Sequence, residues 1–410
     1  MAKIFAERIV VSIDVGTTKI CVLVAHAFDK DHIEIIGVGK APSDGLRKGV
    51  VVDIQKTVSS IKAAIQEAEL MANVTINSAA IGISGGHIQS LNSQGMVAIK
   101  NEEVQALDIA NVMNAARAIT ILEGMQILHA LPQFFIIDSN QKVQNPLGMY
   151  GVRLEVQAHI IMGAIASVQN LVKCCQMAGV SVSDIILEQL ASADAVLSYD
   201  EREIGVAMLD IGGGTSDLAL YQNGNIRHTF VLPVAGNHFT NDIAIGLRTT
   251  IKEAERIKKE YGLALSCLLE KNQIIEIQMA HAQETQVVEQ SDLLAIIAPR
   301  AQELLCLIHE EISSHNLEGM MSAGLVITGG GSLLPGMKEL AQSIFKVPVR
   351  IGVLGAKHSL QQPLESPIYA TAYGLLKQTI KQENKALDAL VGPGITRIFM
   401  RMKSWVIDFF

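Results

Sequence analysis

Two short motifs combine acidic residues, glycines and hydroxyl side chains in an order that suits a metal-bound polyphosphate. Residues 14–19 read Asp-Val-Gly-Thr-Thr-Lys, and residues 210–217 read Asp-Ile-Gly-Gly-Gly-Thr-Ser-Asp. Each motif follows an apolar, β-branched run, which predicts a strand that ends in a carboxylate and then turns through glycine. Backbone N–H groups in such turns can converge on an oxyanion. Two turns that face each other would clamp a polyphosphate.

The residue types also suggest how the ligand would be held. Asp14 and Asp210 offer hard oxygen ligands for Mg2+, through bound water. Glycines let the main chain approach phosphate, while threonine hydroxyls and a lysine add donors. The remaining candidate phosphate-binding residues are Gly16, Thr17, Thr18, Lys19, Gly212, Gly213, Gly214 and Thr215. One such motif alone would fit an ordinary strand and turn, so the prediction depends on the pair.

Two further segments are candidates for contacts with the base and ribose. Residues 325–328 predict a short strand, followed by Gly329, Gly330, Gly331 and Ser332, which suit a close approach to a flat base or ribose. A tight strand-to-helix turn is the alternative. Glu255 and Lys258 lie three apart on a predicted helix and share a face, so both could reach a ribose and base edge. A solvated charged face is the alternative for this pair.

In chain order, the three glycine clusters resemble the phosphate-1, phosphate-2 and adenosine elements of the actin, sugar-kinase and heat-shock-chaperone ATPase superfamily. The resemblance implies an α/β fold of two halves around a nucleotide cleft that binds ATP and Mg2+. By analogy with actin relatives, Glu188 is the candidate for orienting the attacking water, and Gln189 is an equally plausible neighbour. We expect slow or negligible hydrolysis, so whether the chain is an enzyme stays open.

The composition agrees with a large α/β protein. The chain has 410 residues, of which 49% are hydrophobic and only 4% aromatic, and no apolar run of about 18 residues predicts a transmembrane helix. Lys3, Glu7 and Arg8 precede the first strand, so we expect no signal peptide and a cytoplasmic location. The net charge of −8 disfavours nucleic acid as a partner. The spacing of the five cysteines and eleven histidines predicts neither a disulfide framework nor a metal site.

The elements expected to position these motifs divide the chain into several segments. Periodicity and changes of composition predict a first α/β half at 1–84, which is completed by 159–190 and by a late return near 366–380. An α+β subdomain is inserted at 85–158. The second α/β half is expected at 191–224 and 321–365, with a helical/strand subdomain inserted at 225–320. A linker at 381–394 and an amphipathic helix at 395–410 follow.

The terminal segment has its own signal. At 100° per residue its large apolar side chains, except Met400 and Ile407, fall on one arc, and Arg397 and Arg401 fall opposite that arc. This pattern predicts a helix lying in the headgroup plane of an anionic membrane. A helix docked on the protein's own core is the alternative, but the polar, glycine-containing stretch before it reads as a tether. The candidate membrane-binding residues are Ile395, Arg397, Ile398, Phe399, Arg401, Met402, Lys403, Trp405, Val406, Phe409 and Phe410.

Further segments narrow the resemblance to the FtsA family of bacterial cell-division proteins. They are residues 43–49 (Ser-Asp-Gly-Leu-Arg-Lys-Gly), 81–88 (Ile-Gly-Ile-Ser-Gly-Gly-His-Ile), 129–132 and 145–149. The resemblance covers essentially the whole chain. It implies a peripheral protein on the cytoplasmic side of the inner membrane at the division septum.

The resemblance also implies partners. The chain would polymerise, tether the ring of the tubulin-like protein FtsZ by binding the FtsZ tail on 225–320, and recruit later division proteins through 85–158. Two alternatives stay open, a pilus-assembly adaptor of similar fold and a sugar- or acid-kinase-like phosphotransferase. A kinase has no evident need for the terminal helix.

Overall fold

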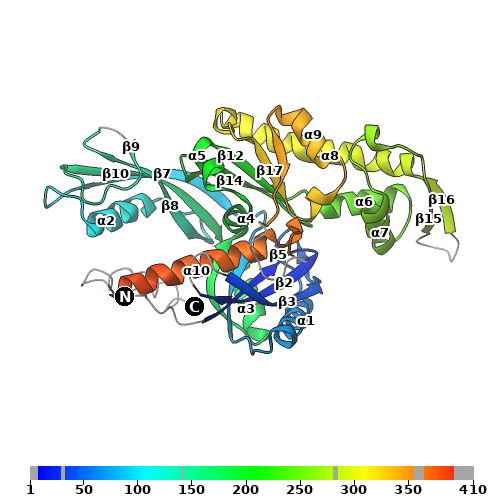
Figure 1. Cartoon of the computed structure of the whole chain (residues 1–410), viewed down its shortest axis with the longest axis horizontal. Coiled ribbons are helices and arrows are strands. Elements are labelled where there is room, and N and C mark those ends of the chain that lie inside the picture. Colours follow the sequence, from blue (N-terminus) through cyan, green and yellow to red (C-terminus); the bar gives the residue numbers. More distant parts are fainter. Residues whose placement is uncertain (1–7, 29–32, 140–141, 280–284, 355–363, 392–410) are drawn as a thin grey trace.

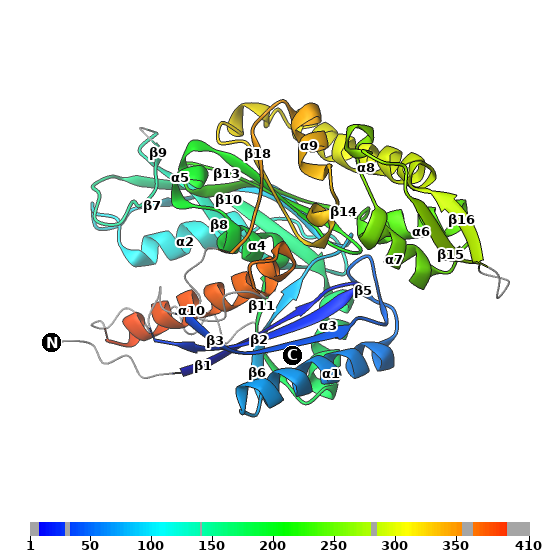
Figure 2. The same ribbon diagram turned by 45° about the vertical axis from the view of Figure 1, so that its right-hand side comes forward.

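The computed structural model describes residues 8–28, 33–139, 142–279, 285–354 and 364–391. Within these ranges the chain forms two five-stranded sheets, one four-stranded sheet and two two-stranded sheets. Figures 1 and 2 show the five-stranded sheets on either side of the long helix α10 (Ala370–Val391), drawn in orange to red. We call them the first and second main sheets in chain order.

The first main sheet has the strand order β11-β6-β1-β2-β3. β1, β2 and β3 pair antiparallel in series, whereas β6 and β11 add in parallel on the other side of β1. Nearly every residue of β1 and β2 is buried, as expected of strands covered on both faces. The strands are β1 (Arg8–Val15), β2 (Lys19–Ala27), β3 (Ile33–Pro42), β6 (Ser78–Ile83) and β11 (Ser181–Leu187).

The second main sheet repeats this plan with the order β14-β13-β12-β17-β18. Again three antiparallel strands follow one another, and two parallel strands complete the sheet. β1 and β12 therefore occupy equivalent central positions, and each carries one of the two motif aspartates near its carboxyl end. The strands are β12 (Val206–Ile211), β13 (Ser216–Gln222), β14 (Asn225–Leu232), β17 (Leu325–Thr328) and β18 (Val349–Ile351).

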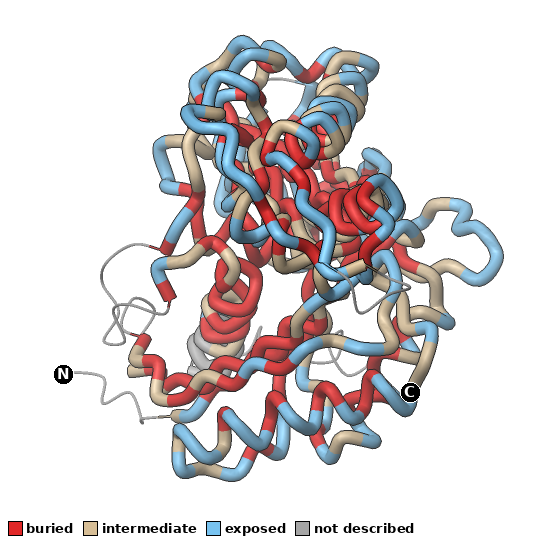
Figure 3. Tube along the Cα trace, turned by 90° about the vertical axis from the view of Figure 1, so that its right-hand side faces the viewer, coloured by how far each residue is buried: buried red, intermediate tan, exposed pale blue. Residues whose placement is uncertain are grey.

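Helices cover both faces of each main sheet. α1 (Ile54–Ala72) and α3 (Ile165–Met177) pack on one face of the first sheet, and α10 packs on the other. α4 (Glu188–Val196) covers the near face of the second sheet and contacts α10. The far face of the second sheet is covered by α6 (Gly236–Gly246), α7 (Ile251–Tyr261), α8 (Gln290–Ser314) and α9 (Met337–Phe345). Figure 3 shows buried residues following the strands and exposed residues on the outer helices.

The four-stranded sheet has the order β7-β10-β8-β9 and carries α2 (Ala106–Arg117) on one face. It lies at the opposite end of the long axis from α6 and α7 (Figure 1). Hydrogen bonds join it to β14, because Ser90 and Gln133 donate to the carbonyls of Thr229 and Arg227. Its strands are β7 (Gln89–Ala98), β8 (Met125–Ile137), β9 (Lys142–Val143) and β10 (Arg153–Ala164). β10 therefore continues past residue 158, where the inserted α+β subdomain was expected to end.

The remaining elements are short. Two strand pairs form the two-stranded sheets: β4 (Leu46–Arg47) with β5 (Val50–Val51), and β15 (Ile274–Gln278) with β16 (Thr285–Glu289). The remaining helix is α5 (Tyr199–Ile204). The 3-10 turns are η1 (Ser266–Leu268), η2 (Glu318–Met320), η3 (Gly330–Leu333) and η4 (Pro367–Tyr369). Among the described residues, no helix combines the length and the apolar character needed to cross a bilayer.

Two further expected boundaries differ from the structure. The second inserted subdomain was expected to begin at 225, but 225–232 form β14, whose pairing with β13 makes it the edge of the second main sheet. The linker was expected at 381–394, but α10 continues to Val391, because 381–391 contain good helix formers and no glycine or proline. The predicted membrane helix at 395–410 lies outside the described residues.

Candidate functional site

The two motif aspartates lie near the ends of equivalent strands, and both are almost fully buried. Asp14 ends its strand opposite Cys21, and Asp210 pairs with Asp217 across β12 and β13. The exposed fractions of Asp14 and Asp210 are 5% and 7%. Lys19 Nζ contacts Asp14 Oδ2 at 2.9 Å. The duplicated sheet plan therefore presents two equivalent carboxylates.

Asp210 is held by side chains from elements far away in sequence. Its Oδ2 accepts hydrogen bonds from Ser192 Oγ on α4 at 2.6 Å and from Thr371 Oγ1 on α10 at 3.1 Å. Neither partner was predicted, because each lies on a helix whose packing against the second motif is a tertiary feature. A lone serine or threonine carries no local sequence signal for such a role.

The two glycine turns contact each other directly. A Cβ atom at Gly213 would overlap the side chain of Thr18, and a Cβ atom at Gly214 would overlap that of Thr17. Thr17 Oγ1 also accepts a hydrogen bond from the backbone N–H of Gly49 (3.1 Å). The structure thus brings the predicted phosphate-binding residues together, and the threonine side chains occupy the space between the turns.

Gly16, Gly212 and Thr215 shape the turns themselves. A Cβ atom at Gly16 would lie 2.9 Å from the carbonyl oxygen of Lys19, so a side chain there would crowd the turn. The Gly212 N–H donates to the Thr215 carbonyl at 2.9 Å, which closes the second turn. Thr215 Oγ1 donates to Asp217 Oδ2 at 3.0 Å. In this structure the Thr215 hydroxyl therefore orients a carboxylate.

The site carries an excess of buried acidic groups. Burial, together with the nearby carboxylates of Asp14, Asp217 and Asp210, raises the pKa of Glu188 well above its ordinary value. Burial also raises the pKa of Asp210, and it raises the pKa of Asp217 to about 7. Burial alone would lower the pKa of Lys19, but Asp14, Cys21 and Asp210 together raise it, so the net shift is upward. A bound cation would relieve this accumulation of negative charge.

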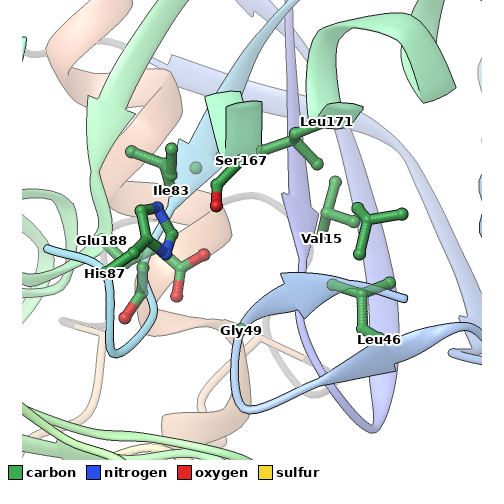
Figure 4. Close-up of a pocket in the computed structure, with 11 residues that line it drawn as sticks. Val15, Leu46, Gly49, Ile83, His87, Ser167, Leu171 and Glu188 are labelled. Carbon is green, nitrogen blue, oxygen red and sulfur yellow. The ribbon is translucent and has the colours of Figure 1, made fainter. Parts of the chain in front are cut away.

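Glu188 lines a small cavity beside the site, and Figure 4 shows its carboxylate close to the ring of His87. The cavity is otherwise lined by the polar Ser84 and Ser167 and by apolar side chains from β1, β4, β5 and α3. Both ring nitrogens of His87 are buried and make no hydrogen bond with the described residues. His87 is a site residue that spacing alone did not single out, although it follows the glycine pair in 81–88.

Gln189, the alternative to Glu188, points to Asp217. Its Nε2 donates to Asp217 Oδ1 at 2.9 Å, and Ser84 Oγ donates to the same oxygen at 2.6 Å. The side-chain oxygen of Gln189 is buried without a hydrogen-bond partner among the described residues. A buried acceptor without a donor suits a site that receives water or a ligand.

Glu255 and Lys258 lie together beside the second glycine turn. Lys258 Nζ contacts Glu255 Oε2 (2.5 Å), Thr240 Oγ1 (2.9 Å) and the Gly236 carbonyl (3.1 Å). Gly236 is bound to the turn, because its N–H donates to the Gly212 carbonyl at 3.0 Å. The pair is therefore part of the same site, although its members bind each other as the charged-face alternative also expects.

The third glycine cluster meets the second aspartate. Gly329 has a φ of +79°, and a Cβ atom there would overlap Asp210 Oδ1, so both its conformation and its neighbour favour glycine. Gly330 is exposed, Gly331 packs on Ile211, and Ser332 Oγ donates to the Gly329 carbonyl at 2.7 Å. The predicted helix start is a 3-10 turn, η3.

The donor set fits a magnesium-bound polyphosphate. The carboxylates of Asp14, Asp210, Asp217 and Glu188 are of the type that could ligate such an ion, and Lys19 lies next to the first of them. The glycine turns supply unhindered backbone N–H groups. The predicted membrane-binding residues, from Ile395 to Phe410, lie outside the described residues.

Solved structures share this architecture at low sequence identity. The PilM–PilN type IV pilus biogenesis complex matches with a TM-score of 0.66 and 16% identity, covering 90% of this chain and 98% of that one. MreB5 of Spiroplasma citri bound to ADP matches with a TM-score of 0.54 and 17% identity, covering 92% and 98%. The chain therefore has the actin-like ATPase fold.

Sequence comparison identifies the family. A model of the cell division protein FtsA matches residues 207–374, and a model of the SHS2 domain inserted in FtsA matches residues 85–162. FtsA of Pseudomonas aeruginosa is 41% identical over 99% of both chains. FtsA of Escherichia coli K12 is 36% identical over 99% of both, and FtsA of Bacillus subtilis is 37% identical over 90% of this chain and 83% of its own. This chain belongs to the FtsA family of cell division proteins.

Proposed function

We propose that this chain is an ATP-binding, polymerising adaptor that ties the FtsZ ring to the cytoplasmic face of the inner membrane at the division septum. The observation that carries the nucleotide part is the meeting of the two glycine turns, each beside a buried aspartate at the end of an equivalent strand. Membership of the FtsA family supports the role in division.

In this proposal Asp14 and Asp210 hold Mg2+ through water, and the turns that follow them bind the phosphates. Lys258 and Glu255 face the ribose and base, and 329–332 approach the adenosine. Glu188 orients the attacking water. Burial raises the pKa of Glu188, and a buried carboxyl with a shifted pKa is typical of a group that takes part in the chemistry of a site. We expect turnover to be slow or negligible. ATP then acts chiefly by fixing the two halves in a polymer-competent arrangement.

Replacing Asp14 tests the nucleotide site. Asp14→Asn removes a negative charge that faces the metal, so affinity for Mg-ATP is expected to fall about tenfold or more, a change of at least about 1.4 kcal/mol. Titration with a fluorescent ATP analogue in the presence of Mg2+ measures this change. Asp200→Asn, which alters an exposed carboxylate on α5, is the matched control. Equal affinity of both variants and the parent chain would refute the metal assignment.

The membrane part of the proposal concerns 395–410. A single amphipathic helix of this length binds weakly, so firm attachment needs several copies held in one polymer. Co-sedimentation with anionic liposomes should pellet the intact chain, and more so with Mg-ATP. A chain that ends at Val391, where α10 ends, should stay in the supernatant. If both chains pellet equally, the membrane anchor does not lie in 395–410.

The partner surfaces are assigned to the two inserted regions. We place the FtsZ tail on the region expected at 225–320, now taken to begin after β14, and later division proteins on the region expected at 85–158. These regions lie at opposite ends of the long axis (Figure 1), so both partners could bind one copy at the same time. Deleting the FtsZ tail should abolish binding of FtsZ without affecting self-association.

A further inference from the structure

Three side chains with metal-binding groups meet where β14 passes the end of α8. His228 lies on β14, Glu311 lies in the last turns of α8, and His315 follows that helix directly. His228 Nε2 is 2.9 Å from Glu311 Oε1, and His315 Nδ1 is 3.3 Å from the same oxygen. One ligand atom from each residue lies within 4.8 Å of the other two.

The spacing matches what one small divalent ion requires. Two ligands that bind a tetrahedral zinc ion at about 2.0–2.1 Å lie roughly 3.3 Å apart. The two separations from Glu311 Oε1, 2.9 and 3.3 Å, are close to this value, and the two histidine ligand atoms lie within 4.8 Å of each other. An ion could therefore enter if the histidine side chains move slightly. Two imidazoles and a carboxylate also form a donor set typical of zinc, and not of Mg2+, which prefers oxygen alone.

The surroundings leave one side of the cluster open. The side chains of His228 and Glu311 are 15% and 18% exposed, whereas that of His315 is 51% exposed. Three protein ligands with solvent on one side leave a position for water. The two imidazole rings lie 4.7 Å apart between centroids, so both rings face the same small space beside Glu311.

A metal ion at this cluster must displace the existing hydrogen bonds of His315. His315 Nδ1 also lies 3.0 Å from the backbone carbonyl of Glu311 and 3.1 Å from Ser314 Oγ. Without an ion, a proton on Nδ1 can be shared with that carbonyl. Metal binding exchanges this proton for the ion, so affinity should fall as the pH is lowered.

We propose that His228, Glu311 and His315 bind a divalent ion of the zinc class, with water as the fourth ligand, and thereby fasten the edge strand β14 to the end of α8. The next residue of β14 faces the four-stranded sheet, where Thr229 Oγ1 contacts His159 Nε2 at 2.9 Å. The ion therefore fixes the strand against which the inserted sheet packs. The histidine spacing could not indicate this site, because His228 and Glu311 are 83 residues apart.

The test uses the full chain, stripped with a chelator and free of nucleotide. Titration with Co2+ should give one saturable equivalent with the intense visible absorption of tetrahedral cobalt, and Zn2+ should remove that absorption. His228→Ala and His315→Ala are expected to weaken Zn2+ binding at least tenfold in calorimetry. Glu311→Gln, which keeps the shape of the side chain, should weaken it less.

His309→Ala is the matched control, because His309 also lies on α8 but packs against Phe345. It should bind like the parent chain. Circular dichroism establishes that each variant is folded. Because the side chain of His315 is half exposed, His315→Ala is expected to disturb folding least. The proposal is overturned if the parent chain shows no saturable binding, or if His315→Ala and His309→Ala bind equally.

Discussion

At the scale of single residues, the buried carboxylates make the stability of the nucleotide-free chain depend on pH. Burial raises the pKa of Asp217 to about 7, from an ordinary value near 3.8. The folded chain therefore holds a proton that the unfolded chain releases between about pH 4 and pH 7. Stability from this group is fully present below pH 4 and is lost as the pH rises through 7. A bound cation should flatten this dependence.

Asp217→Asn is expected to remove that contribution, because asparagine keeps the shape but cannot ionise. The change in unfolding free energy between pH 4.5 and 7.5 should differ from that of the parent chain by at least about 1.4 kcal/mol, equivalent to a tenfold change in proton affinity. Urea unfolding at both pH values measures it. Burial lowers the pKa of His129 to about 4 and of His159 to about 3, which favours stability at higher pH. Both histidines remain in the variant, so the effect of Asp217 is read from the difference between the variant and the parent chain. If the unfolding free energy changes equally with pH in both, the prediction is contradicted.

The sequence could predict the residues of the site whose chemistry is local. Asp14 and Asp210 each lie between an apolar strand and a glycine turn, so they can be singled out from their neighbours in the chain. Ser192, Thr371 and His87 could not be found in this way, because they reach the site from other elements. Their positions depend on how helices pack, which a local pattern does not encode.

At the scale of elements, the contact between α4 and α10 depends on one glycine. A Cβ atom at Gly374 would overlap the carbonyl oxygen of Ala191 and displace backbone. Gly374→Ala should therefore lower the free energy of unfolding by about 1–3 kcal/mol, despite the better helix propensity of alanine. Gly319→Ala is the control, since nothing lies within 4 Å of its Cβ position, and it should stay within about 0.5 kcal/mol. Thermal unfolding compares the two variants. Equal unfolding midpoints would show that α4 and α10 can move apart at little cost in free energy.

The helices and strands themselves were largely predictable, whereas their assignment to layers was less so. The apolar residues of α1 (Ile54–Ala72) recur at helical spacing, so this helix can be recognised from the sequence alone. β14 was assigned to an inserted region, since an alternating strand looks the same whether it extends a large sheet or begins a new one. The end of α10 resembles a linker in sequence because its polar residues run into Gly392, Pro393 and Gly394.

At the scale of the whole molecule, the contact between the glycine turns closes the space in which phosphates would lie. Thr17 and Thr18 of the first half fill the positions beside Gly214 and Gly213 of the second. A polyphosphate between the turns must therefore move them apart. α10 packs on the first main sheet and α4 on the second, so these two helices connect the parts that would move.

Mg-ATP is accordingly expected to increase the distance between the two halves. Leu70 on α1 and Ile245 on α6 are both highly exposed. Spin labels attached at Leu70→Cys and Ile245→Cys report this distance by double electron–electron resonance spectroscopy. Cys267 and Cys306 are first replaced by serine, because they are not buried. The distance distribution should shift to longer values with saturating Mg-ATP and stay unchanged in an Asp210→Asn background at the same concentration. If binding saturates without a shift, the threonine side chains alone must rotate aside, and the two halves do not separate to admit the nucleotide.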